Sequence, residues 1–336
     1  MKAIMKAIAA PALAALLLAA PAHADDFYQG KTLNIVVGYT AGGGYDINAR
    51  LAARHISRHI PGAPNVVVVN MPGAGSLRSL EYLDKQAAKD GTVVGLFDYT
   101  QITNSLLTPA KVPIDFRKFK WIGSIQQDLA VCYVWHTVKA RTIADMQGLK
   151  VINMGRTNPG TSSDTQQRIL RKLFNVNVHS VAGYAGSAEG FIAVERGELE
   201  GGCMTWASLP PHWIADKKIV PIMRITDGTA PDMPAGVPVA AELLTQDRDR
   251  KVLRVLSAPG EVGKPLVVHL SVPDDRVTIL RNAFAAMVKD PAFIADAAKV
   301  RQPVTPTLGA QATKILDEVY ATPPDIIEAA RAVAND

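Results

Sequence analysis

Predicted strands and helices alternate through most of the chain, and this order constrains the fold more than any other feature of the sequence. In the first series, expected strands at 33–37, 66–70 and 92–97 are separated by helical periodicity at 47–60 and 77–88. A β-α-β-α-β order is typical of an α/β sheet with parallel strands. The first third of the chain is therefore expected to form such a sheet.

A second series of alternating elements begins near residue 129. Strands are expected at 129–135, 150–154, 177–181, 199–204 and 220–225, and helices at 163–174 and 188–196. After a Pro-, Gly- and Asp-rich loop at 227–238, the pattern predicts a charged helix at 242–256, a strand at 266–270 and helices at 277–288 and 310–320. Two such series with a late return strand predict two lobes joined by crossing strands at a hinge.

Chain length agrees with two lobes, because 336 residues exceed the roughly 100–200 residues of one domain. We expect residues 25–126 and 262–336 to form lobe 1 and residues 127–261 to form lobe 2. The C-terminal helices are then expected to pack back on the first lobe.

The first 24 residues have the pattern of a secretory signal peptide. Lys2 and Lys6 form a positive region, an apolar run covers 8–20, and Ala22-His23-Ala24 resembles an A-x-A cleavage site. The apolar run is shorter than the ~20 residues that span a bilayer, so an uncleaved anchor is the weaker alternative. The mature chain is expected to be a soluble periplasmic protein.

The charge of the chain favours a small anion over nucleic acid as a ligand. The formal net charge is +5, and loss of the two signal lysines reduces it to +3. Such a mild and dispersed excess suits an anionic solute, but it is too small for a nucleic-acid surface. The apolar fraction of 48% fits a well-packed globular protein.

Cys132 and Cys203 are the two cysteines of the chain. An oxidising compartment permits a disulfide between them, whereas free cysteines are often buried as small apolar residues. Both alternatives stay open from the sequence, and a Cα–Cα distance within ~7 Å would decide for the disulfide.

Four glycine-bearing loops each lie between an expected strand and an expected helix. They cover residues 38–46, 70–76, 155–164 and 183–187. The first N–H groups of a helix lack partners within the helix and carry partial positive charge, so they suit a carboxylate or phosphate. In α/β sheets these loops lie at the carboxyl ends of the strands, where ligands bind. Four helix N-termini are therefore expected to converge on one cleft.

Side chains near these loops add two candidates for ligand contact. Arg156 stands in the third loop and could pair with a carboxylate through two hydrogen bonds. Trp206 ends a strand beside the fourth loop, which makes it the tryptophan best placed to reach a ligand. Asp46 and Ser76 are expected to cap the helices that follow their loops.

Motifs for enzymes are incomplete. The run that begins at Gly73 has Arg78 where a dinucleotide site needs its third glycine. His55 and His59 could share a helix face, but Ile56 replaces the glutamate of the metalloprotease motif. A solvated basic face, shared with neighbouring arginines, is the better interpretation. We expect a protein that is not an enzyme, with neither a cofactor nor a metal.

Taken together and in order, the loops resemble one known family, the substrate-binding proteins of tripartite tricarboxylate transporters, also called Bug receptors. The resemblance covers essentially the whole mature chain. Its motifs are Gly42-Gly43-Gly44-Tyr45-Asp46, Asn70-Met71-Pro72-Gly73-Ala74-Gly75, Lys89-Asp90-Gly91-Thr92, Gly183-Tyr184-Ala185-Gly186-Ser187 and Glu195-Arg196-Gly197-Glu198. The sequence departs from the family at Ser76, usually glycine, and at Ala185, usually lysine.

The resemblance implies a type II-like, two-lobed periplasmic-binding-protein fold that closes on a small organic acid. It also implies a monomeric receptor that delivers this acid to a membrane permease of two subunits. By position, the implied ligand contacts are Tyr39, Gly43, Asp46, Gly73, Ala74 and Gly75 from one lobe and Thr157, Thr161, Ser162, Tyr184 and Gly186 from the other. A ligand sensor for a signalling partner and a periplasmic esterase or transferase are the alternative functions.

Overall fold

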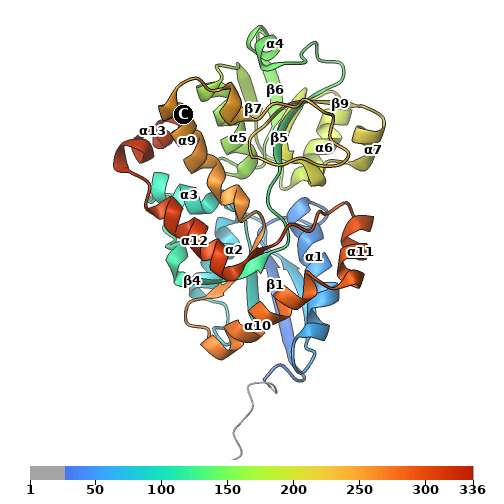
Figure 1. The fold of residues 1–336 in the computed structure, drawn as a ribbon, viewed down its shortest axis with the longest axis vertical. Helices are drawn as coiled ribbons and strands as arrows, with labels where there is room; N and C mark the ends of the chain where they lie inside the picture. The colour runs from blue at the N-terminus through green and yellow to red at the C-terminus, as the bar shows by residue number, and fades with distance from the viewer. Residues whose placement is uncertain (1–26, 336) are drawn as a thin grey trace, which may run out of the picture.

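The computed structural model describes residues 27–335 and contains two mixed β-sheets, each covered by helices. Figure 1 shows two lobes, one above the other, with β1, β4, α1, α2, α10, α11 and α12 in the lower lobe and β5, β6, β7, β9, α5, α6 and α7 in the upper lobe. The predicted signal peptide lies outside the described residues. No described helix is both long and apolar enough to cross a membrane.

The first sheet has the strand order β11-β4-β10-β3-β1-β2. Its strands are β1 (Thr32–Val37), β2 (Asn65–Asn70), β3 (Val93–Leu96), β4 (Phe119–Ser124), β10 (Pro265–His269) and β11 (Thr307–Leu308). Strand β1 pairs in parallel with β2 and β3, as the sequence predicts. The return strand β10 is inserted antiparallel between β3 and β4, so the two ends of the chain share one sheet.

The second sheet has the strand order β7-β6-β8-β5-β9. Its strands are β5 (Ala130–Trp135), β6 (Ile152–Gly155), β7 (Val178–Val181), β8 (Gly201–Thr205) and β9 (Ile219–Arg224). Strand β6 is parallel to β7 and β8, whereas β5 runs antiparallel to β8 and β9. The carboxyl ends of the parallel strands carry the third and fourth glycine loops.

Helices cover both sheets. The α-helices are α1 (Gly44–Ile56), α2 (Leu77–Lys85), α3 (Thr100–Leu107), α4 (Ile143–Gln147), α5 (Ser162–Leu173), α6 (Ser187–Glu195), α7 (Pro211–Ala215), α8 (Ala240–Leu243), α9 (Asp247–Ser257), α10 (Asp274–Met287), α11 (Pro291–Lys299), α12 (Gly309–Tyr320) and α13 (Pro324–Ala334). Short 3-10 helices occur at Ser57–His59, Ala74–Ser76, Phe116–Lys118, Trp206–Ser208 and Ala258–Glu261.

One expectation about helices was wrong, and another was correct only in part. The helix expected at 242–256 is broken into α8 and α9 because the backbone is extended at Leu244 and Gln246. On the expected basic face, Arg54 and Arg58 are exposed, but His55 is buried and its Nε2 lies 3.0 Å from Asp296 of α11. His59 approaches Asp290 in the same way, so this face holds α1 against the segment around α11.

The chain crosses between the sheets at 125–129 and again at 258–264. The two crossings are joined by a hydrogen bond from the Asp128 N–H to the Gly260 carbonyl, at 2.7 Å. Gly263 has φ of +66°, and a Cβ there would collide with the Gln126 carbonyl oxygen. This close backbone approach requires glycine, and it fixes the second crossing against the first.

The C-terminal helices do not all return to the first lobe. Helices α10 and α12 pack on β4 there, as expected. Helix α13 instead packs on α9 and α5, and its Ile326, Ala330 and Val333 belong to the core around the second sheet. A third crossing therefore lies between α12 and α13, within the range expected to form lobe 1.

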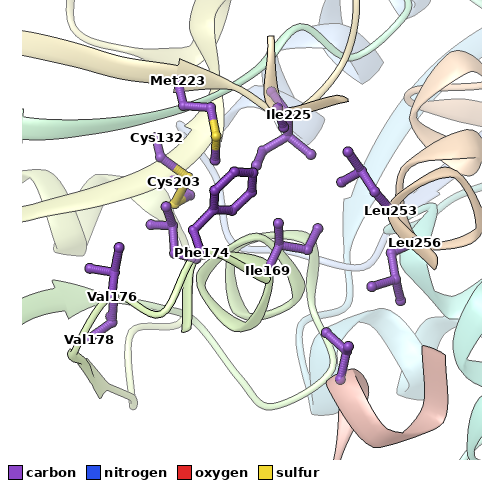
Figure 2. Packing of buried hydrophobic residues seen from close by; sticks show 14 of the residues in the cluster. Cys132, Ile169, Phe174, Val176, Val178, Cys203, Met223, Ile225, Leu253 and Leu256 are labelled. Atoms are coloured by element: carbon purple, nitrogen blue, oxygen red, sulfur yellow. A yellow bond between two sulfur atoms is a disulfide. The ribbon is translucent and has the colours of Figure 1, made fainter. Parts of the chain in front are cut away.

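A disulfide joins Cys132 of β5 to Cys203 of β8. The two residues stand directly opposite each other in the antiparallel pair, with their Cα atoms 4.0 Å apart. Figure 2 shows the bridge beside Phe174 and Met223 in the core of the second lobe. Of the two alternatives left open by the sequence, the structure therefore shows the disulfide.

Candidate functional site

The glycine loops of the two lobes meet. A Cβ at Gly186 would lie 2.5 Å from Thr40 Oγ1, and a Cβ at Gly75 would lie 2.7 Å from Thr161 Cγ2. A Cβ at Gly43 would come within 3.1 Å of Ser187 Oγ. Side chains at these glycines would force the lobes apart, so the loops need glycine for contact across the cleft as well as for their turns.

A cavity of about 90 Å³ lies where the loops meet. It is lined by Tyr39, Gly43, Gly44, Tyr45, Gly155, Arg156, Thr157, Ser162, Ser163, Tyr184, Gly186, Ser187, Gly190, Met204, Thr205, Ser208 and Lys264. Seven of the thirteen predicted site residues are among them, namely Tyr39, Gly43, Arg156, Thr157, Ser162, Tyr184 and Gly186. The first, third and fourth glycine loops thus contribute to one cavity.

Asp46 is not among the lining residues, because its carboxylate holds the first loop together. Its Oδ2 accepts hydrogen bonds from the Gly42 N–H and from Arg50 Nε, both at 2.9 Å, and its Oδ1 accepts one from Asn70. Burial opposes ionisation of Asp46, but these hydrogen bonds outweigh it and hold its pKa below the ordinary value. It lies in the first turn of α1, whose N-cap is Gly43.

The second glycine loop lies beside the cavity without lining it. Gly73, Ala74, Gly75 and Ser76 all have positive φ, between 47° and 142°. For Ala74 and Ser76 this conformation is strained, and strain of this kind concentrates at functional segments. Ser76 does not cap α2 with its side chain; its Oγ accepts a hydrogen bond from the Asp98 N–H instead.

Thr161 and Trp206 are also outside the cavity lining. Thr161 is the buried N-cap residue of α5, and its hydroxyl donates to the Asn158 carbonyl. Trp206 is 2% exposed, and its Nε1 donates to Asp232 Oδ1 at 2.8 Å. Its ring packs in the core beside Trp213 and borders a separate cavity of about 880 Å³ between the crossing segments and residues 301–305.

Arg156 borders the glycine-loop cavity, but it is already held in an ion pair. Its guanidinium is paired with Asp164, whose side chain is fully buried and also accepts from Arg168 Nε and the Gly160 N–H. The arginine therefore neither stands free in the cleft nor points to solvent. Only its Nε is buried without a hydrogen-bond partner among the described residues.

A second cation of this cavity, Lys264, was not predicted from the sequence. It is 3% exposed, and among the described residues its Nζ forms no ion pair and one long hydrogen bond, to Thr205 Oγ1 at 3.3 Å. Its stem passes the start of α1, where a Cβ at Gly44 would lie 3.4 Å from Lys264 Cε. Burial lowers the pKa of Lys264, and the carboxylates of Asp128 and Asp98 oppose this.

Asp98 was missed as well. It follows β3 and is fully buried at the junction of the lobes. Its Oδ2 accepts hydrogen bonds from Tyr39 Oη at 2.7 Å, from the Ser162 N–H at 3.0 Å and from Ser162 Oγ at 2.9 Å. Burial and the neighbouring Asp98 carboxylate raise the pKa of Tyr39, so this tyrosine keeps its proton and remains a donor.

Sequence relatives of the chain are UPF0065 proteins. A protein of Agrobacterium vitis is 24% identical over 287 residues, which cover 84% of this chain and 78% of the relative. One of Bordetella pertussis is 26% identical over 193 residues, 56% of this chain and 58% of the relative. The chain thus spans less than two thirds of the second of these relatives. No protein-family model matches.

Solved structures with a similar fold are periplasmic binding proteins. BugD superposes with a TM-score of 0.72 at 18% identity, over 91% of this chain and 98% of BugD. A Rhodopseudomonas palustris protein, MatC, with bound malate has a TM-score of 0.70 at 16% identity, over 91% and 99%. An R. palustris protein with adipate gives 0.69 at 19%, over 90% and 96%.

At such low identities these structures establish the fold alone. They show the two-lobed α/β architecture of periplasmic binding proteins, as expected from the sequence. In sequence, the chain is similar to UPF0065 proteins. In fold, it is similar to periplasmic binding proteins such as BugD.

Proposed function

We propose that this protein binds a small organic carboxylate in the periplasm and delivers it to a two-subunit permease of the tripartite tricarboxylate type. The observation that carries the proposal is Lys264, a buried ammonium group at the glycine-loop cavity with no carboxylate partner among the described residues. A buried charge is unfavourable unless it is paired and hydrogen-bonded. A ligand anion would supply the missing partner.

The surroundings of Lys264 favour an anion over a neutral ligand. The ammonium lies near the N-terminus of α1, where free N–H groups and the helix dipole also attract negative charge. The Tyr45 ring, 5.5 Å from Lys264 Nζ, offers only a weak cation–π contact. Malate and adipate, held by two proteins of the same fold, are themselves carboxylates, which supports this ligand class.

Binding between lobes couples capture to a change of shape. Residues from both lobes line the cavity, so a ligand that contacts both lobes favours the closed form over the open one. In our proposal the permease recognises the closed form. The protein acts as a receptor and performs no chemistry on the acid. Its signal peptide directs export, and cleavage after residue 24 releases the mature protein in the periplasm.

Titration of the mature protein with a panel of organic acids tests this function. At a ligand concentration 100 times Kd, binding should raise the free energy of unfolding by about 2.7 kcal/mol and increase Tm measurably. Calorimetry should give one site per chain. Stabilisation by sugars or amines alone, with no response to any carboxylate, would disprove the proposed ligand class.

Carboxylate binding should also take up protons in alkaline solution. Burial holds the pKa of Lys264 below 10.5 in the free protein, and a bound anion raises it because the anion favours the ammonium form. Affinity should therefore fall as pH rises through the pKa of the free protein. Calorimetry in two buffers of different ionisation enthalpy measures the uptake; equal enthalpies at every pH would contradict it, and Lys264→Met should show none.

A further inference from the structure

A carboxylate of the chain itself fills the anion position where the two lobes meet. Asp98 Oδ2 receives three donors, which are Tyr39 Oη from the first lobe and the N–H and Oγ of Ser162 from the second. Ser162 is the first residue of α5, so its N–H is one of the groups that the helix cannot satisfy internally. A ligand carboxylate would use the same donors.

Asp98 has no capacity left for a ligand, and a ligand anion cannot share its place. Its Oδ1 accepts from the N–H and the Oγ1 of Thr100, at 3.0 and 2.7 Å, which ties Asp98 to the start of α3. Nearby, Asn104 Nδ2 donates to the Gly160 carbonyl. Two carboxylates at one buried position repel each other strongly, so the second-lobe position is closed to ligand anions.

The two cations that line the cavity differ in their partners. Arg156 is held by Asp164, a buried carboxylate that also pairs with Arg168, whereas Lys264 forms no ion pair with any described residue. Between these groups the lining includes the stacked rings of Tyr39 and Tyr45, 4.9 Å apart, and Met204. Of the two cations that line the cavity, Lys264 is therefore the one without a carboxylate partner among the described residues.

We propose that Asp98 makes this protein a receptor for monocarboxylates. One ligand carboxylate meets Lys264, and the Asp98 carboxylate excludes an acid whose second carboxylate would reach Ser162. This inference rests on the proposed function, because it names the class of acid that the same site takes. The ligand is a short organic acid with a single carboxylate and an uncharged body.

Matched pairs of acids test the selectivity of the wild-type protein. Butyrate and succinate, or pentanoate and glutarate, have chains of equal length and differ in the second carboxylate. Calorimetry should show binding of each monocarboxylate at least tenfold tighter than that of its dicarboxylate partner. Dicarboxylates that bind as tightly as their partners, or more tightly, would overturn the inference.

Variants of Asp98 test the cause of that selectivity. Asp98→Gly vacates the position, so succinate should gain at least tenfold in affinity relative to butyrate. Added formate should fill the vacancy and raise the Tm of Asp98→Gly, with no such effect on the wild type. Asp98→Asn keeps the size of the side chain and removes its charge, so the preference for butyrate over succinate should weaken. Formate should not change the Tm of this variant, because the position stays filled.

The outcomes separate this inference from the function on which it rests. If the wild type binds no carboxylate at all, the proposed function fails. If it binds carboxylates but neither Asp98 variant changes the ratio of the paired affinities, only the role of Asp98 fails. If Asp98→Gly does not fold, the wild-type pairs and Asp98→Asn decide by the same criteria.

Discussion

Replacing Lys264 with methionine should weaken carboxylate binding by about 2–4 kcal/mol, which corresponds to roughly 30- to 700-fold in Kd. Methionine keeps most of the length and the apolar character of the lysine stem and removes the ammonium group. In the wild type the ammonium group is buried beside the cavity without a carboxylate partner among the described residues. The variant should also be no less stable without ligand, because a buried charge has been removed.

Lys314→Met is the matched control for this change, since Lys314 lies exposed on α12. Calorimetry of both variants against the tightest acid of the panel gives the comparison. The control should bind like the wild type. If Kd is unchanged in Lys264→Met, the lysine does not contact the bound acid, and the glycine loops alone make the anion contacts.

Loss of the disulfide should cause the largest change in stability. The bridge closes a loop between positions separated by 71 residues in the chain, and disulfides typically contribute about 2–4 kcal/mol by restricting the unfolded state. The double variant Cys132→Ala/Cys203→Ala should therefore have a free energy of unfolding lower by this amount. Denaturant titration at equilibrium measures the difference.

Reductant provides the internal control for this prediction. When dithiothreitol is present during the titration, the free energy of unfolding of the wild type should fall to a similar extent. That of the double variant should not change. The bridge lies in the core of the second lobe beside Phe174 (Figure 2), so carboxylate affinity should change little. Equal stability of wild type and double variant, with and without reductant, would contradict the predicted contribution.

Local patterns in the sequence were sufficient to predict most of the two lobes. Strands such as β1 and β2 are short apolar runs bounded by turns, and the glycine loops after them mark where α1 and α5 begin. Both signals are local, so they can be recognised without knowledge of tertiary contacts. The break between α8 and α9 depends on packing, whereas the charged sequence there has the pattern of one continuous helix.

Residues that depend on long-range contacts could not be predicted in this way. A lone lysine normally reaches solvent. Nothing next to Lys264 in the sequence indicates that the return segment carries it into a cavity formed by residues 56 to 225 positions earlier in the chain. Asp98 did have a signal, since it directly follows an expected strand at its carboxyl end. The helix after it, Thr100–Leu107, was not predicted, and the aspartate was therefore not considered as a cap or a site residue.

The position of α13 has a consequence for biosynthesis. The first sheet needs β10 and β11 from the last quarter of the chain, and the core of the second sheet needs Ile326, Ala330 and Val333 from the final helix (Figure 1). Chains generally fold as they emerge, one complete unit at a time. A nascent chain of this protein therefore cannot complete the first core before α12 is synthesised, or the second core before α13 is synthesised.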